Sequence, residues 1–377
     1  MYNSKYDDIR PYYNHEVNEK IQILLADPVF DRVLMHVYEK PEKIQQVKKF
    51  LSTLHTIEEL QHKYLYELIE MVVETTTSGL TYDGIDYLEK DKPYLFISNH
   101  RDIILDSALL NYLIFKNGMN TTQIAIGSNL LILDWIVHAV KLNRSFIINR
   151  EATARELLAA SQKVSEYIRD SITKQHMSVW IAQREGRTKD GADLTQISLL
   201  KMLNMSNSKS FAEGFAELNV VPVSISYEIE PCGIGKVREL LKKNGTNGYV
   251  KTSKDDLKSM AKGMFGQKGG IHFAFGEPLN AELENFDMEG KPNELFQQLA
   301  GCIDNHIHKQ FKLWPNNYVA HDVLTGKKTY AGCYNGDDKK TFMKLVREAQ
   351  TSLNENPDDI RTSFLNLYAN PVINANN

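Results

Sequence analysis

The chain has 377 residues, of which 42% are hydrophobic and 24% are charged, and its formal net charge is −4. This length allows a large buried core, and the composition is that of an ordinary globular protein. The negative net charge excludes a global positive field of the kind that attracts nucleic acid, so an anion site has to be a local cluster of arginine and lysine.

Residues 1–88 are expected to form a helical N-terminal region. Apolar residues recur at helical spacing from Val17 to Tyr38 and again from Ile57 to Val73, with prolines as breaks. No group of catalytic residue types occurs there, so packing or a lid is the expected role. The first residues contain no apolar run, and we therefore expect no signal peptide.

From Leu80 onward, short β-rich runs alternate with amphipathic helices. The expected strands are 80–82, 94–97, 123–126, 145–150, 177–182, 220–227 and 271–275, and the expected helices include 109–115, 157–172 and 295–311. This alternation predicts an α/β fold with a mixed, mostly parallel sheet flanked by helices. We assign it to residues 89–315. The helical C-terminal extension, 316–377, is expected to hold one helix around 342–353 and a frayed polar end at 374–377.

Two features bear on the compartment. The cysteines, Cys232, Cys302 and Cys333, are odd in number and far apart, which argues against a disulfide framework or a zinc site and favours a reducing cytosol. No segment reaches the roughly 18 apolar residues of a membrane-spanning helix. The apolar stretch 130–140 is interrupted by Asp134 and His138. Its plainer interpretation is a half-buried helix, and the sharper one is a surface helix that contacts a bilayer or an acyl chain.

The strongest chemical signal is a histidine at a strand end. An apolar run ends in Ser98-Asn99-His100-Arg101-Asp102, after which a helix is expected. Turns of this kind are where parallel α/β folds place their chemistry. A neutral histidine can act as general base if a carboxylate fixes its tautomer.

Two carboxylates compete as partners of His100. Asp102 is well placed to cap the following helix. Asp106 can reach His100 only across a turn, because six residues of continuous helix would separate them by about 9 Å. Ser98 is a less favoured nucleophile, since no G-x-S-x-G elbow surrounds it.

A second group of residues is basic. Arg150 ends one expected strand and Arg187 follows another, and Arg144 and Lys189 stand near them in sequence. Arginine binds phosphate oxygens through two parallel hydrogen bonds, so two arginines from different strand ends can converge on one phosphate. Gly186 permits a close backbone approach or a left-handed turn beside Arg187.

These blocks, in this order, resemble the glycerolipid acyltransferases, the superfamily of glycerol-3-phosphate and lysophosphatidic acid acyltransferases. The matching segments, between residues 80 and 315, are Ser98-Asn99-His100-Arg101 with Asp106-Ser107-Ala108-Leu109-Leu110, Phe146-Ile147-Ile148-Asn149-Arg150, Glu185-Gly186-Arg187-Thr188, Val221-Pro222-Val223 and Phe275-Gly276-Glu277-Pro278-Leu279. The family usually has four residues between its histidine and aspartate, and this chain has five between His100 and Asp106. We favour Asp106 as the partner, with Asp102 as the alternative.

The resemblance implies an O-acyltransferase of phospholipid synthesis. His100 would be the general base and Asp106 its partner, and a hydroxyl of glycerol-3-phosphate or lysophosphatidic acid would attack an acyl thioester of coenzyme A or acyl carrier protein, without a metal or other cofactor. The substrate-binding residues would be Arg101, Arg150, Glu185, Gly186, Arg187 and Pro222. The family works at the cytoplasmic membrane surface, which implies a cytoplasmic, peripheral location.

Other functions stay open beside this one. The acceptor could be a different lipid, for example one that contains an amino acid. A non-catalytic lipid-binding protein of the same fold is a second alternative, against which the intact His100, Asp106, Arg150 and Arg187 argue. Hydrolysis of the thioester, with water as the acceptor, is a third.

Overall fold

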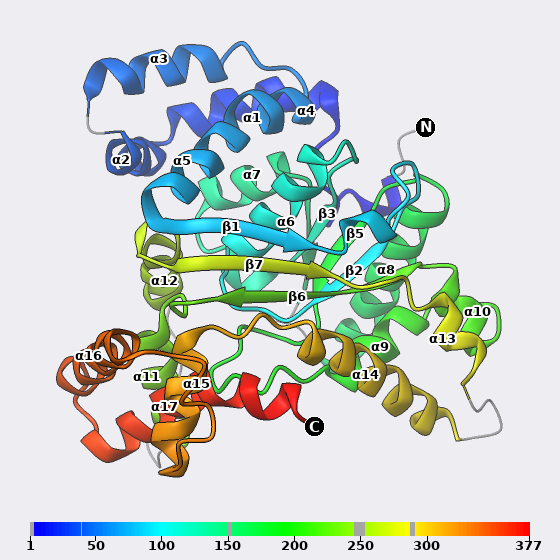
Figure 1. The fold of residues 1–377 in the computed structure, drawn as a ribbon. Coiled ribbons are helices and arrows are strands. Elements are labelled where there is room, and N and C mark those ends of the chain that lie inside the picture. Colours follow the sequence, from blue (N-terminus) through cyan, green and yellow to red (C-terminus); the bar gives the residue numbers. More distant parts are fainter. Residues whose placement is uncertain (1–3, 39, 150–152, 245–252, 287–290) are drawn as a thin grey trace.

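The structure is a computed structural model that describes residues 4–38, 40–149, 153–244, 253–286 and 291–377. In this part of the chain, seven strands form one sheet in the order β1-β7-β6-β2-β5-β3-β4. The strands are β1 (Thr77–Asp83), β2 (Leu95–Ser98), β3 (Gln123–Gly127), β4 (Ser145–Ile148), β5 (Val179–Ala182), β6 (Val220–Tyr227) and β7 (Gly269–Phe275). The sheet runs through the middle of the molecule (Figure 1).

The predicted mixed, mostly parallel sheet flanked by helices is confirmed. Each pair of neighbouring strands is parallel except β6 and β7, which are antiparallel. The strands from β6 to β4 therefore run in one direction, and their carboxyl ends meet at one edge of the sheet. The strand β1 joins the sheet beside β7, so the helical region that precedes the sheet ends at Thr76.

Helices cover both faces of the sheet. They are α5 (Tyr66–Thr76), α6 (Leu105–Lys116), α7 (Asp134–Leu142), α8 (Ala154–Thr173), α9 (Ile197–Asn204), α10 (Phe211–Ala216), α11 (Gly233–Asn244), α12 (Ser253–Phe265), α13 (Asn280–Glu284) and α14 (Pro292–Lys309). Leu95 and Ile97 of β2 face a core shared with α8, α9 and α14, whereas Phe96 faces a core shared with α5 and α6. Alternate side chains of β2 thus pack into two cores, one on each face of the sheet. The uninterrupted apolar run of a central strand predicts this arrangement.

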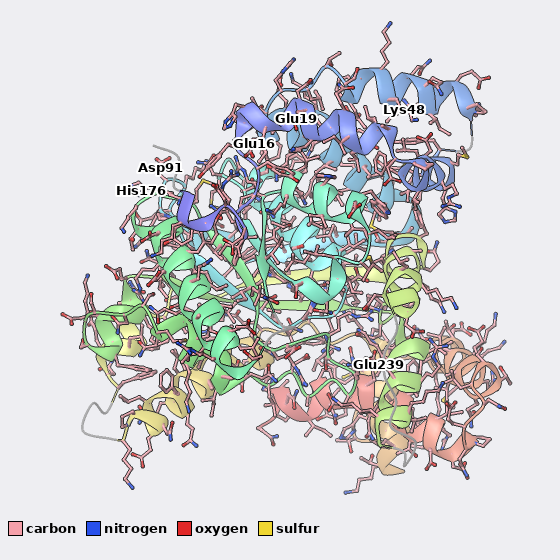
Figure 2. All side chains as sticks on the ribbon, turned by 180° about the vertical axis from the view of Figure 1, so that it is seen from behind. Glu16, Glu19, Lys48, Asp91, His176 and Glu239 are labelled. Atoms are coloured by element: carbon pink, nitrogen blue, oxygen red, sulfur yellow. The ribbon has the colours of Figure 1, made fainter. Side chains whose placement is uncertain are left out.

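The N-terminal helices form a layer of their own above β1, which Figure 2 shows from behind with Glu16 and Lys48 labelled. They are α1 (Asn14–Ala26), α2 (Pro28–Val37), α3 (Pro41–Leu51) and α4 (Ile57–Leu60); short turns of other helix types are Ser4–Tyr6, Gln61–Leu65, Ile85–Tyr87 and Ser128–Leu130. The helix α7 packs under this layer, with the Trp135 ring 6.0 Å from that of Phe30 and His138 Nδ1 2.7 Å from the Tyr12 hydroxyl. This supports the plainer interpretation of residues 130–140. No helix in the described part of the chain is long and apolar enough to cross a membrane.

The predicted helix around 342–353 is confirmed as α16 (Gly336–Ser352), but two further helices of the extension were not predicted, α15 (Pro315–Thr325) and α17 (Pro357–Ala375). The start of α17 carries a signal that we overlooked, because the Asn356 side chain caps it ahead of Pro357 at the first helical position. The expected frayed end is also wrong: the Asn374 side chain is hydrogen-bonded to the loop after β5. Pro371 inside α17 masks the helical pattern.

Candidate active site

The strand β2 delivers His100 to the edge where the parallel strands end. Asn99 shapes the turn, because its side-chain Nδ2 donates to the Ile225 carbonyl (2.9 Å) and its Oδ1 accepts from the Ile225 N–H (2.7 Å). The amide thus takes over the hydrogen bonds of a strand residue toward β6, and the backbone is free to turn away. Asn99 is fully buried, whereas the His100 side chain is 14% exposed and can meet a substrate.

Ser98 has a structural environment. Its Oγ accepts a hydrogen bond from Trp180 Nε1 (3.0 Å) and donates one to the Asn99 carbonyl (2.8 Å), and the residue is fully buried. The Trp180 ring in turn lies edge-on to His100, with the ring centroids 5.8 Å apart. These contacts give no support to Ser98 as a nucleophile.

Asp106 is the carboxylate that pairs with His100. Its Oδ2 lies 2.8 Å from His100 Nδ1 and also accepts the N–H groups of Arg101 (2.6 Å) and Asp102 (2.9 Å). Its Oδ1 accepts from the Tyr227 hydroxyl (2.9 Å). Four hydrogen bonds hold this buried carboxylate in one orientation. Because a carboxylate accepts, we assign the His100 proton to Nδ1, which leaves Nε2 free as a base.

Asp102 caps the next helix instead. Its Oδ1 accepts from the N–H groups of Ile104 and Leu105, each at 2.9 Å. Its Oδ2 is buried without a hydrogen-bond partner among the described residues, and a Cβ added to Gly263 of α12 would lie 2.1 Å from it. Burial, followed by the charge of Asp106, raises the pKa of this carboxyl.

Arg101 lies in a buried ion-pair network. Its Nη1 donates to Glu230 (3.1 Å), its Nη2 pairs with Asp193, and its carbonyl accepts from Lys236 Nζ (2.6 Å), which also bonds Glu230. Burial alone would lower the pKa of the guanidinium, but the two carboxylates raise it above its ordinary value. With its side chain 1% exposed and held by Asp193 and Glu230, the predicted role of Arg101 in substrate binding gains no support.

The segment of residues 184–193 after β5, which we name the Arg187 loop, lies beside this turn. The Thr188 N–H donates to the His100 carbonyl at 2.9 Å. Gly186 has a φ of 71°, the left-handed conformation that its position predicts, and Glu185 is exposed. The Arg187 side chain is 7% exposed, and its Nη1 is buried with no hydrogen-bond partner among the described residues.

The other basic residues of the predicted cluster are engaged elsewhere. Arg144 donates to Thr121 and pairs with Glu58. Lys189 lies 3.1 Å from Glu239 on α11, which is labelled in Figure 2. Arg150 lies outside the described residues. The phosphate site predicted from two converging arginines therefore rests, in the described part of the chain, on Arg187.

Pro222 is buried in β6 opposite Ile97 of β2. Its carbonyl accepts the Gly276 N–H (2.8 Å), and the ladder between β6 and β7 begins at the next residue, Val223. The missing proline N–H therefore falls at the end of that ladder, where its loss costs least. Its predicted role in substrate binding stays a prediction.

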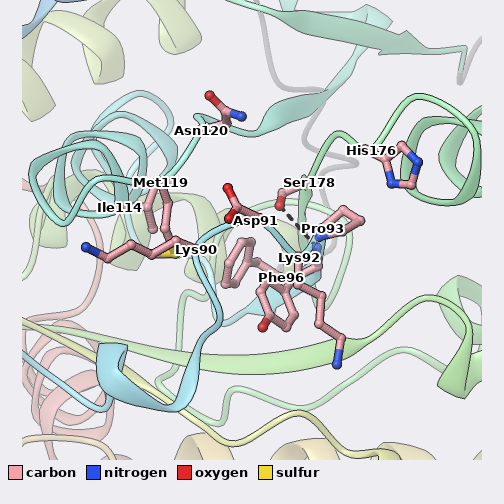
Figure 3. Close-up of a pocket in the computed structure, with 11 residues that line it drawn as sticks. Lys90, Asp91, Lys92, Pro93, Phe96, Ile114, Met119, Asn120, His176 and Ser178 are labelled. Carbon is pink, nitrogen blue, oxygen red and sulfur yellow. Dashed lines mark hydrogen bonds between the residues drawn. The ribbon is translucent and has the colours of Figure 1, made fainter.

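Two further features lie away from the His100 turn. A small pocket lined by Lys90, Asp91, Phe96 and His176 among others sits around the amino end of β2, opposite the edge that carries His100 (Figure 3). Among the described residues, Glu282, Cys302 and His306 could hold a metal ion. However, His306 already bonds Glu282, and burial raises the pKa of Cys302 to about 11, which disfavours the thiolate that a metal needs.

Several residues that build the site escaped the sequence reasoning. Asp193, Tyr227 and Glu230 lie far from the His100 turn along the chain, and no local pattern marks them as its partners. Tyr227 carries the one usable signal, since it ends the expected strand 220–227 and buried Tyr hydroxyls usually have a hydrogen-bond partner.

The family model described as "Acyltransferase" matches residues 79–227, which include the His100 turn, the Arg187 loop and β6. The glycerol-3-phosphate acyltransferase of Pseudomonas entomophila is 25% identical over 346 residues, which is 84% of this chain and 40% of that protein. That of Ectopseudomonas mendocina is 25% identical over 355 residues, 86% of this chain and 41% of that protein. The chain thus spans about two fifths of the length of these curated relatives.

Among solved structures, the 1-acyl-sn-glycerophosphate (LPA) acyltransferase PlsC from Thermotoga maritima aligns with 78% of this chain and 95% of its own, at 13% identity and a TM-score of 0.35. The match of residues 79–227 to the family model, together with the curated relatives, confirms the resemblance of the chain to the glycerolipid acyltransferase superfamily.

Proposed function

We propose that the protein transfers a fatty acyl group from an acyl thioester to a hydroxyl of a glycerol-phosphate acceptor, either glycerol-3-phosphate or lysophosphatidic acid. The observation that carries the proposal is the pair of His100 Nδ1 and Asp106 Oδ2, at 2.8 Å. A histidine oriented by a buried carboxylate, with the ring partly exposed, is equipped to take a proton from a bound hydroxyl.

In this proposal His100 Nε2 accepts the proton of the acceptor hydroxyl as the oxygen attacks the thioester carbonyl. Asp106 stabilises the imidazolium that forms. The C–S bond then breaks, and the departing thiolate takes the proton back from His100, so that the products are an ester and a free thiol. The step needs neither a covalent acyl-enzyme nor an added redox partner.

Arg187 is our candidate for the acceptor phosphate, because its buried Nη1 has no hydrogen-bond partner among the described residues. A buried donor without a partner is costly, and a phosphate oxygen would satisfy it. Arg150, Glu185, Gly186 and Pro222 stay in the proposal as further substrate contacts. So do the acyl carrier, coenzyme A or acyl carrier protein, and a cytoplasmic membrane surface as the place where the lipid is met.

The test is an acyl-transfer assay with radiolabelled acyl-CoA or acyl carrier protein and either acceptor, followed by separation of the lipids. We expect labelled ester with one of the two acceptors, and His100→Ala should reduce the rate at least 10²- to 10⁴-fold while the protein stays folded. Release of labelled fatty acid without ester would identify a hydrolase. Full activity of His100→Ala would remove His100 from its role.

A further inference from the structure

The C-terminal helix α17 holds the backbone of the Arg187 loop. Its Asn370 side chain donates to the Asp190 carbonyl (2.7 Å), and its Asn374 side chain donates to the carbonyls of Gly191 (3.2 Å) and Ala192 (2.9 Å). Two amide side chains, one turn apart on the same face of α17, thus satisfy three consecutive carbonyls. The side chains of α17 thus provide the hydrogen bonds that loop carbonyls usually form with water.

A proline of α17, Pro371, and a glycine of the loop, Gly191, allow this close contact. Pro371 has no N–H, so the Leu367 carbonyl four residues earlier loses its partner in the helix. Gly191 packs against this carbonyl with a φ of +77°, and an added Cβ would lie only 2.5 Å from the Leu367 oxygen. Glycine is therefore the residue that fits here. The loop packs against the turn of α17 in which Pro371 leaves the Leu367 carbonyl without its helical hydrogen bond.

The held segment connects to the His100 turn within three residues. The Gly191 N–H donates to Thr188 Oγ1 (3.0 Å), and the Thr188 N–H donates to the His100 carbonyl (2.9 Å). Thr188 is fully buried. Movement of residues 190–192 would therefore displace Thr188 and its neighbour Arg187 relative to His100.

A second contact runs from α17 to the other side of the turn. The Tyr368 hydroxyl accepts the Glu230 N–H (2.8 Å), and Glu230 accepts from Arg101 Nη1 (3.1 Å). The Arg101 N–H is one of the donors to Asp106. Hence α17 contacts the loop that carries Arg187 and also Glu230, which holds Arg101 beside the His100–Asp106 pair. None of the residues of α17 lies in the matched family segment, 79–227.

We infer that α17 is a positioning element for the acyl-transfer site, and that Asn370 and Asn374 are positioning residues that set the place of Arg187 relative to His100. This inference rests on the proposed function for its effect on catalysis. It gives the C-terminal extension a task beyond packing: the extension shapes the binding site for the acceptor phosphate from behind, without touching substrate.

The test is the double variant Asn370→Ala/Asn374→Ala, with Asn376→Ala as matched control. Asn376 lies on the same helix, but its side chain donates to Tyr330 and to the Val372 carbonyl rather than to the loop. We expect the KM for the phosphate acceptor to rise about tenfold in the double variant, with the KM for the acyl donor unchanged. Equal rises in both KM values, or no rise, would overturn the inference.

Amide hydrogen exchange provides a readout that does not depend on activity. Residues 186–195 should exchange faster in the double variant than in the wild type or in Asn376→Ala, because the loop has lost its anchors. Unchanged exchange would refute the anchoring. If the wild type transfers no acyl group to either acceptor and exchange still rises, the proposed function fails while the anchoring stands. Should the double variant not fold, the two single variants are measured in the same way.

Discussion

Two buried arginines border the His100 turn, and their surroundings differ. Both terminal nitrogens of Arg101 meet carboxylates, those of Glu230 and Asp193. Within the described part of the chain, Arg187 instead has a buried Nη1 without a hydrogen-bond partner, and the Oδ2 of the nearby Asp102 carboxyl has none either. Arg101 also has a buried nitrogen, Nε, without a hydrogen-bond partner among the described residues, but both of its terminal nitrogens are held by carboxylates. Its charge is therefore neutralised within the fold, whereas Arg187 keeps a terminal donor for an anion. Arg101 follows His100 directly and Arg187 belongs to a separate motif, and their contacts distinguish an arginine that supports the turn from one with a terminal donor available.

The largest effect should follow from Arg101→Met. The change removes the cation and leaves Asp193 and Glu230 buried without it, so we expect a loss of about 3–5 kcal/mol in the free energy of unfolding. Urea denaturation measures it. The exposed Arg347→Met should change stability by less than about 0.5 kcal/mol. An Arg101→Met protein as stable as the wild type would show that Arg101 is not the supporting arginine.

Arg187→Met should impair binding of the acceptor more than it impairs stability. Its Nη1 donates to no described residue, although its charge acts on Asp102 and its side chain bonds Cys232. Stability should therefore fall by less than in Arg101→Met, by about 1 kcal/mol. The KM for the acceptor should rise about 10- to 100-fold, since a charge-assisted hydrogen bond contributes about 1.5–3 kcal/mol. Steady-state kinetics with each substrate varied in turn would detect this. An unchanged KM for the acceptor would contradict the assignment of Arg187 to the acceptor phosphate.

Tyr227→Phe should have a smaller effect, on kcat, because Tyr227 orients Asp106, the partner of His100. Burial, followed by the nearby charge of Asp106, raises the pKa of Tyr227 well above its ordinary value, so it remains a phenol that donates to Asp106. Loss of this hydrogen bond should lower kcat about 2- to 10-fold with both KM values retained. Tyr334→Phe removes a similar bond, to Asp322, outside the site and should leave kcat as it is. Equal kcat values for the two variants would argue against a role for Tyr227.

Asp102→Asn should have the smallest effect, and it should depend on pH. The pKa of Asp102 is raised above its unfolded value of about 3.9, so its stabilising contribution is complete below that value and is lost as pH rises through the folded pKa. The variant keeps an oxygen for the cap but carries no charge. Its unfolding free energy should therefore gain on that of the wild type as the pH rises above about 4. A difference that is constant with pH would contradict this.

Much of the fold could be predicted from local patterns. The alternation of strands and helices, the limits of β6 and the turn after β2 follow from runs of apolar residues and the polar residues that end them. The choice between Asp102 and Asp106 could not be made at that level, because it depends on how tightly the backbone turns. Asn99 decides it by bonding Ile225 in another strand, which frees the chain to bring Asp106 back to His100.

The sequence by itself determined the order of the strands along the chain, the strand-end histidine and the acyltransferase motifs, because these are encoded by neighbours within a few residues. Only the tertiary structure decided which arginine is held by carboxylates and which keeps an available donor, and that α17 holds the Arg187 loop. Asp193 and Glu230 stand 92 and 129 residues from Arg101, and Asn370 stands 180 residues from Asp190. Pairs this far apart form through packing of the whole chain, which leaves no periodic trace in the segments that meet.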